Sequence, residues 1–111
     1  MDMNAHSKML KADKKMETYN GNDCVEMERL QKVWLKNAKL CINEKGYCGP
    51  LMEKSSPEKV AAFQSAVDQH KSLLKFFKKW PKAVGHFDIE LVTFQIERRE
   101  AMLAHLIELN R

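Results

Sequence analysis

The segment SPEKVAAFQSAVDQHKSLLKFFKKWPK, residues 56–82, is the most clearly bounded helix pattern in the chain. Ser56 is a typical N-cap, and Pro57 suits the first helical position, where its missing N–H costs nothing. Pro81 ends the pattern because its ring cannot follow a helical turn. One stripe recurs between these limits at alternating spacings of three and four: Val60, Phe63, Val67, His70, Leu74 and Phe77. This spacing predicts a helix over 57–80.

A second face of this predicted helix is basic. Lys71, Lys75, Lys78 and Lys82 follow one another at spacings of four, three and four, with Lys79 beside them. Residues 60–82 carry these five lysines against one acidic residue, Asp68, which gives +4. The whole chain also has a net charge of +4. The excess positive charge of the chain therefore equals what this one segment holds.

Two other segments have helical periodicity and acidic N-caps. Asp23 can cap a helix over about 23–45, and Glu26 stands at the capping-box position. Asp88 can cap a helix over about 88–109. Each segment carries an apolar stripe at about 100° per residue. The three long segments predict an all-α fold.

The arrangement expected for these helices is an antiparallel bundle with short connections. Residues 1–21 are polar and rich in lysine, which favours a mobile or partly helical arm that can add a short helix. A chain of 111 residues has the length of one domain. We therefore predict an arm over 1–21 and a single bundle of three long helices over 22–111.

Each predicted helix has a polar residue near its midpoint, within the apolar arc. These residues are Asn37, His70 and Arg99. Midpoints of equal antiparallel helices lie at the same height, so the three side chains can meet in one buried layer. Such a layer must be hydrogen-bonded throughout, and its use would be to fix helix register. The alternative is that Arg99 extends to the rim and that each residue is satisfied separately.

Composition indicates a soluble cytoplasmic protein. The three cysteines, Cys24, Cys41 and Cys48, form no dense disulfide framework, and we expect them to be reduced. No apolar run approaches the roughly 20 residues that a membrane span needs. The first residues contain no signal-peptide core.

Motifs for catalysis, cofactors and metals are missing from the sequence. There is no CxxC or HExxH pattern, and the four histidines are scattered. No glycine-rich loop precedes a predicted helix, and four glycines in total leave little room for one. We therefore expect no enzyme activity, no cofactor and no metal site. Whether Cys41 and Cys48 bind a metal together with a histidine stays open at this stage.

The expected function is protein binding by a small helical regulator, adaptor or inhibitor of a larger complex, which can be a nucleoprotein. The candidate surface combines the lysines at 71, 75, 78, 79 and 82 with three aromatic side chains that lie off the core arcs or at their edges. These are Phe76, Trp80 and Phe94. Aromatic anchors beside positive charge suit an acidic or amphipathic partner.

Two alternatives remain open. The lysine row could follow the phosphates of a nucleic acid, which would give binding that is sensitive to salt and largely independent of base sequence. The broad apolar arc of the last helix could also support a homodimer. Against nucleic acid, no arginine belongs to the lysine row, and side chains that read bases are sparse there.

Overall fold

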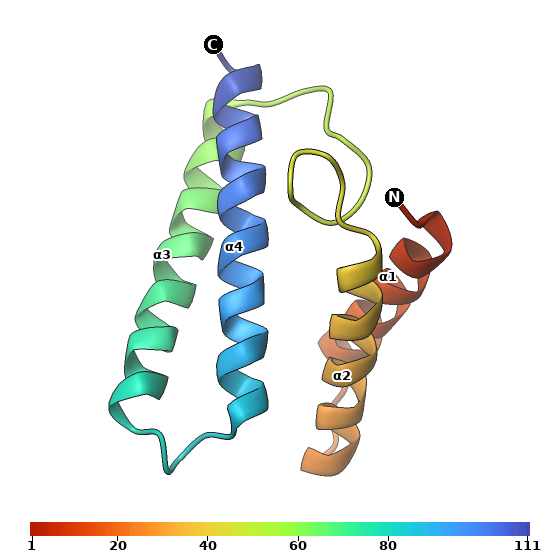
Figure 1. Ribbon diagram of the computed structural model, residues 1–111, viewed down its shortest axis with the longest axis vertical. Helices are drawn as coiled ribbons and strands as arrows, with labels where there is room; N and C mark the ends of the chain where they lie inside the picture. Colours follow the sequence, from red (N-terminus) through yellow and green to blue (C-terminus); the bar gives the residue numbers. More distant parts are fainter. The chain divides into compact units, whose positions relative to one another are not determined.

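The computed structural model describes all residues, 1–111, and contains helices but no strand. Four α-helices follow one another along the chain (Figure 1): α1 Met3–Glu17, α2 Cys24–Leu40, α3 Pro57–Lys79 and α4 His86–Leu109. An isolated antiparallel bridge joins Ile42 to Cys48. The predicted all-α class is confirmed. None of the four helices combines the length and the apolar character that crossing a membrane requires.

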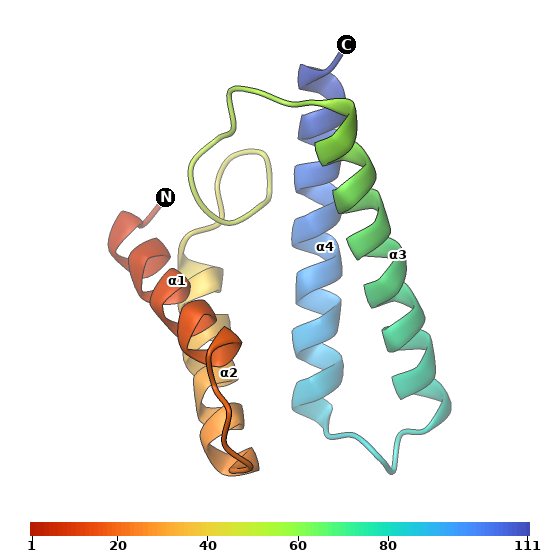
Figure 2. The same cartoon turned by 180° about the vertical axis from the view of Figure 1, so that it is seen from behind.

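The helices pack in two separate pairs, each forming a compact unit. The N-terminal unit comprises residues 1–44 and 48–50, and the C-terminal unit comprises 45–47 and 51–111. In the N-terminal unit α1 and α2 lie side by side and run antiparallel, and α3 and α4 do the same in the C-terminal unit (Figures 1 and 2). Each unit is thus built on one helical hairpin. The expected division into an arm over 1–21 and a domain over 22–111 stays a prediction.

The predicted count of three long helices is not exact, because the polar N-terminal segment forms α1. Asp2 is its N-cap, and the carboxylate accepts a hydrogen bond of 3.0 Å from the Ala5 N–H. Ala5, Met9 and Ala12 are buried at spacings of four and three. Two of these three side chains are alanine, so they let α1 approach α2 closely while contributing little hydrophobicity to the sequence pattern.

The boundaries of α3 and α4 follow from their caps. Ser56 caps α3 by accepting a hydrogen bond of 3.2 Å from the Lys59 N–H, as its position before Pro57 predicts. In α4 the N-cap is Gly85 rather than Asp88. The Asp88 carboxylate instead accepts a hydrogen bond of 2.8 Å from the Gly85 N–H, and the helix therefore starts two residues before the predicted position.

α2 ends at Leu40, five residues before the predicted end, because the following segment folds into a tight turn. The Gly49 N–H donates to the Cys41 carbonyl oxygen at 2.9 Å, next to the Ile42–Cys48 bridge. Gly49 has a φ of 102°, a conformation that favours glycine. These contacts are non-local, and they override the local helical pattern between 41 and 45.

The C-terminal unit buries α4 far more completely than α3. Seven residues of α4 are buried, whereas Val67 is the only buried residue of α3. The segment around Tyr47 also belongs to this unit, and the Tyr47 ring lies 5.7 Å from the His105 ring, centroid to centroid. α3 therefore packs through a narrow strip and leaves a large part of its surface exposed.

Candidate functional site

Three large apolar side chains at the C-terminal end of α3 point to solvent at spacings of three and four, the last of them on the C-cap residue, Trp80. Leu73, Phe76 and Trp80 have exposed fractions of 41%, 54% and 53%. We call these three residues the α3 apolar stripe. The Phe76 ring lies 6.5 Å, centroid to centroid, from the ring of the half-buried Phe77. Residues at such spacings share one helix face, so the stripe is one continuous exposed ridge.

The basic residues of α3 divide into two groups around the helix. Lys79 belongs with the apolar stripe, because its Nζ lies 5.7 Å from the centroid of the Trp80 ring. The row formed by Lys71, Lys75 and Lys78 lies roughly 160° around the helix from the stripe, taking 100° per residue. The predicted surface of lysines and aromatics is thus two surfaces on opposite sides of α3.

The lysine row is mostly unpaired. Lys71 forms an ion pair of 3.6 Å with Glu100 of α4. Lys75 and Lys78 are exposed and form no ion pair, and the same holds for Lys82, which follows the end of α3. Exposed pairs such as Lys71–Glu100 contribute little to stability, so the row keeps most of its positive charge available to a partner.

Phe94 does not belong to either surface. Its exposed fraction is 9%, and the Arg98 guanidinium lies 5.4 Å from the centroid of its ring. The expectation that Phe94 is an exposed anchor is therefore wrong. α4 buries residues on more than one side, whereas the prediction assumed a single buried arc.

Two of the three polar midpoint residues meet in the C-terminal unit. Arg99 Nη1 lies 2.8 Å from His70 Nε2, and His70 Nδ1 lies 2.8 Å from the Ala66 carbonyl oxygen. A guanidinium can only donate, so His70 Nε2 accepts and His70 Nδ1 carries the proton that goes to Ala66. His70 and Arg99 are half-buried, which fits a polar pair at the edge of the α3–α4 contact.

Asn37 is satisfied separately in the N-terminal unit. It is buried, and its Nδ2 donates a hydrogen bond of 2.9 Å to the Val33 carbonyl oxygen on the same helix. A side-chain bond to the carbonyl four residues earlier needs no partner helix. Asn37 therefore needs neither His70 nor Arg99 to satisfy its amide nitrogen.

Replacing His70 with leucine should destabilise the chain, because the Arg99 guanidinium loses its acceptor at a half-buried position. We expect a loss of about 1–3 kcal/mol in the free energy of unfolding. Arg99→Leu should cost at least about 0.5 kcal/mol less in the His70→Leu background than in the unmodified chain. Urea denaturation of the unmodified chain, the two single variants and the double variant measures the coupling between the two residues. Purely additive losses in the free energy of unfolding would contradict an interaction between His70 and Arg99. Gel filtration of His70→Leu shows whether oligomeric state changes as well.

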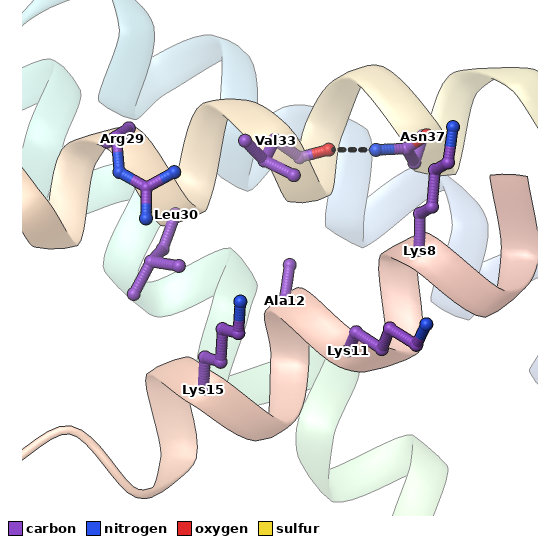
Figure 3. A pocket seen from close by; sticks show the side chains of 8 residues that line it. All are labelled: Lys8, Lys11, Ala12, Lys15, Arg29, Leu30, Val33 and Asn37. Carbon is purple, nitrogen blue, oxygen red and sulfur yellow. Dashed lines mark hydrogen bonds between the residues drawn. The ribbon is translucent and has the colours of Figure 1, made fainter.

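A basic groove lies between α1 and α2 in the N-terminal unit. Its volume is about 190 Å³. Figure 3 shows Lys15 and Arg29 reaching toward each other across it from the two helices. The lining residues are Lys8, Lys11, Ala12, Lys15, Arg29, Leu30, Val33 and Asn37. This volume is below the roughly 300–1,000 Å³ of typical small-molecule sites. The groove is therefore smaller than the sites that enclose drug-sized ligands.

The arginine of this groove is already engaged. Arg29 Nη2 and Nε donate to the two carboxylate oxygens of Glu26, at 2.6 Å and 2.9 Å. These hydrogen bonds hold the pKa of Glu26 below its ordinary value. The net positive charge of the groove therefore comes from its three lysines. The groove could not be expected from the sequence as long as residues 1–21 were predicted to form a mobile or partly helical arm.

Two thiols meet at the end of α2, while the third, Cys24, is exposed. Cys41 and Cys48 both contact the carbonyl oxygen of Ala38, and Cys41 Sγ also lies 3.9 Å from Met9 Sδ. The structure places no group of three or more His, Cys, Asp or Glu side chains where they could hold a metal ion. In comparisons with known proteins, no family model, no curated protein and no solved structure matches this chain.

Proposed function

We propose that this chain is a small, non-catalytic protein-binding module that acts as a regulator, adaptor or inhibitor of a larger complex. The observation that carries the proposal is the α3 apolar stripe. Leu73, Phe76 and Trp80 expose about half of their surface on one helix face, although nearby apolar residues are covered. Large exposed apolar ridges of this kind are typical of interaction sites.

The spacing of the stripe suits a helix that enters an apolar groove of its partner. Anchors three and four residues apart are the pattern by which amphipathic helices are recognised. Trp is among the residues that contribute most to binding energy at interfaces, and Phe is enriched in them. Lys79 beside Trp80 supplies a positive charge at the rim, which would steer an acidic partner. The partner that fits is therefore a protein with an apolar groove and acidic edges.

The cytoplasm is the proposed place of action, because no disulfide joins the three cysteines. A second copy of the chain is another occupant of the stripe, and sedimentation analysis of the purified protein distinguishes self-association from binding to a larger partner.

Phe76→Ala and Trp80→Ala should each weaken partner binding by roughly 30-fold, or about 2 kcal/mol, which is the range of interface hot spots. The partner is captured from native lysate with the tagged chain, in the presence and absence of nuclease, and its affinity is then measured by calorimetry. Leu40→Ala is the matched control, because Leu40 has an exposed fraction of 55% but belongs to α2. If both aromatic variants bind as tightly as the control, the stripe is not the interface.

Nucleic-acid binding through the lysine row is the second candidate. The exposed and unpaired Lys75, Lys78 and Lys82 favour it. Replacing Lys71, Lys75 and Lys78 with glutamate should then reduce affinity by a similar factor for all sequences, and binding by the unmodified chain should weaken steeply with salt. In this case nuclease abolishes the capture, and Trp80→Ala, on the opposite side of α3, has little effect.

A further inference from the structure

Cys41 and Cys48 bring their thiols to the same carbonyl oxygen. Cys41 Sγ is 3.5 Å and Cys48 Sγ is 3.2 Å from the same acceptor, the carbonyl oxygen of Ala38. The Cys48 side chain also acts on the Cys41 thiol and opposes part of the rise in its pKa. Because the two thiols share an acceptor, their sulfur atoms are neighbours in the folded N-terminal unit.

The backbone holds the two cysteines in this position. Ile42 pairs with Cys48 in an antiparallel bridge, and the Gly49 N–H donates to the Cys41 carbonyl oxygen at 2.9 Å. Asn43 Nδ2 closes the turn by donating to the Gly49 carbonyl oxygen at 2.7 Å. Cys41 therefore pairs with Gly49, the residue next to Cys48, and the backbone keeps the two cysteines close to each other.

The two thiols differ in access. Cys41 is fully buried, whereas Cys48 is only half-buried. Burial also raises the pKa of the Cys41 thiol, so less of it is present as the reactive thiolate. An oxidant from solvent can therefore reach Cys48 first, and Cys41 is placed to react second.

We propose that Cys41 and Cys48 form a dithiol site that a small-molecule disulfide such as oxidised glutathione converts to an intramolecular disulfide. The Cys48 thiolate attacks one sulfur of the oxidant, and one glutathione leaves as a thiolate that takes up the proton lost by Cys48. The Cys41 sulfur then attacks Cys48 Sγ, and the second glutathione leaves with the proton lost by Cys41. Two protein thiols are oxidised to one S–S bond while the oxidant is reduced to two thiols.

The disulfide would join the end of α2 to the segment that follows it, close to α1. Cys41 Sγ lies 3.9 Å from Met9 Sδ, so the covalent link forms against buried side chains of α1. The alternative is that the three sulfur atoms lie together only because they pack as soft apolar groups. The two interpretations differ in how strongly the fold favours the S–S bond.

The test uses the full-length chain carrying Cys24→Ser, which removes the exposed thiol. The protein is equilibrated with mixtures of reduced and oxidised glutathione, in buffer and in concentrated urea, and the products are trapped by alkylation and measured by mass spectrometry. We expect a disulfide between Cys41 and Cys48, with an equilibrium constant at least tenfold larger in the folded chain than in urea. By thermodynamic linkage, the folding equilibrium constant of the oxidised chain should exceed that of the reduced chain by the same factor.

Single substitutions test the order of the two steps. Adding Cys41→Ser should leave a persistent mixed disulfide between glutathione and Cys48. Adding Cys48→Ser leaves Cys41 as the only thiol. This buried thiol should react with oxidised glutathione at least tenfold more slowly than Cys48 reacts in the chain that carries Cys41→Ser. A folded-chain equilibrium constant equal to or below the value in urea would overturn the proposal and leave apolar packing as the role of both residues. Mixed disulfides as the final product of the Cys24→Ser chain would overturn it equally.

Discussion

Replacing Leu106 with alanine is expected to lower the free energy of unfolding by about 2–5 kcal/mol, the range measured for fully buried leucines. Leu106 lies in α4 and has an exposed fraction of 0%. The substitution removes its buried apolar contacts and leaves a cavity that a well-packed surrounding only partly fills. Chemical denaturation followed by helical circular dichroism measures the loss.

Ile107, the next residue along α4, is the matched control. Its side chain has a similar volume and lies in the same helix, but its exposed fraction is 40%. Ile107→Ala should cost no more than about 1 kcal/mol, because part of the side chain is already in water and alanine has the higher helix propensity. Equal losses for the two variants would contradict the burial pattern of α4 and, with it, the position of α4 in the C-terminal unit.

α3 shows which parts of the fold can be predicted from the sequence. Its start depends on Ser56 and Pro57 and its end on Pro81, and these residues act through local backbone chemistry that needs no tertiary context. The predicted helix over 57–80 and the observed one over Pro57–Lys79 differ by one residue. Asp23 similarly accepts hydrogen bonds from the N–H groups of Val25 and Glu26, as an N-cap should.

α1 and the end of α2 depend instead on contacts between distant residues. α1 buries two alanines and Met9, a stripe too weak in hydrophobicity to stand out from its lysines. α2 stops at Leu40 because Gly49 returns to bond to Cys41. The apolar pattern of a single helix contains no information about the residues that pack against it or bond to its end. The formation of α1 and the early end of α2 therefore could not be predicted from such a pattern.

The candidate surface was predicted in part for the same reason. The exposure of Phe76 and Trp80 follows from their positions outside the core stripe of α3. Leu73 borders the predicted core stripe but has an exposed fraction of 41%, because α3 packs through a narrower strip than a helix within a bundle. Phe94 shows the opposite error, since α4 is buried on more than one side. Helix periodicity predicts which residues share a face of a helix. How many of those faces are buried depends on how many other elements pack against the helix.

Tyr47 is expected to be the residue outside the helices on which the C-terminal unit depends most. Its exposed fraction is 1%, and its hydroxyl accepts a hydrogen bond of 2.8 Å from the Met52 N–H. His105 Nε2 lies 2.8 Å from the Met52 carbonyl oxygen and donates to it. Tyr47 and His105 thus satisfy both backbone polar groups of one residue between the two helical hairpins, in a segment that has no secondary structure of its own.

Tyr47→Ala should lower the free energy of unfolding by about 3–5 kcal/mol, because it removes a fully buried ring. Tyr47→Phe should cost about 1–3 kcal/mol, because it keeps the ring but leaves the Met52 N–H without its acceptor. Tyr19→Phe is the matched control: the Tyr19 hydroxyl also accepts from a backbone N–H, that of Asp23 at 2.9 Å, but at an exposed site where water can replace it. We expect its cost to stay below about 0.5 kcal/mol. Equal costs for the two Tyr→Phe variants in chemical denaturation would mean that the Tyr47 hydroxyl is replaceable by water, and the buried hydrogen bond would then contribute nothing to holding this segment on α4.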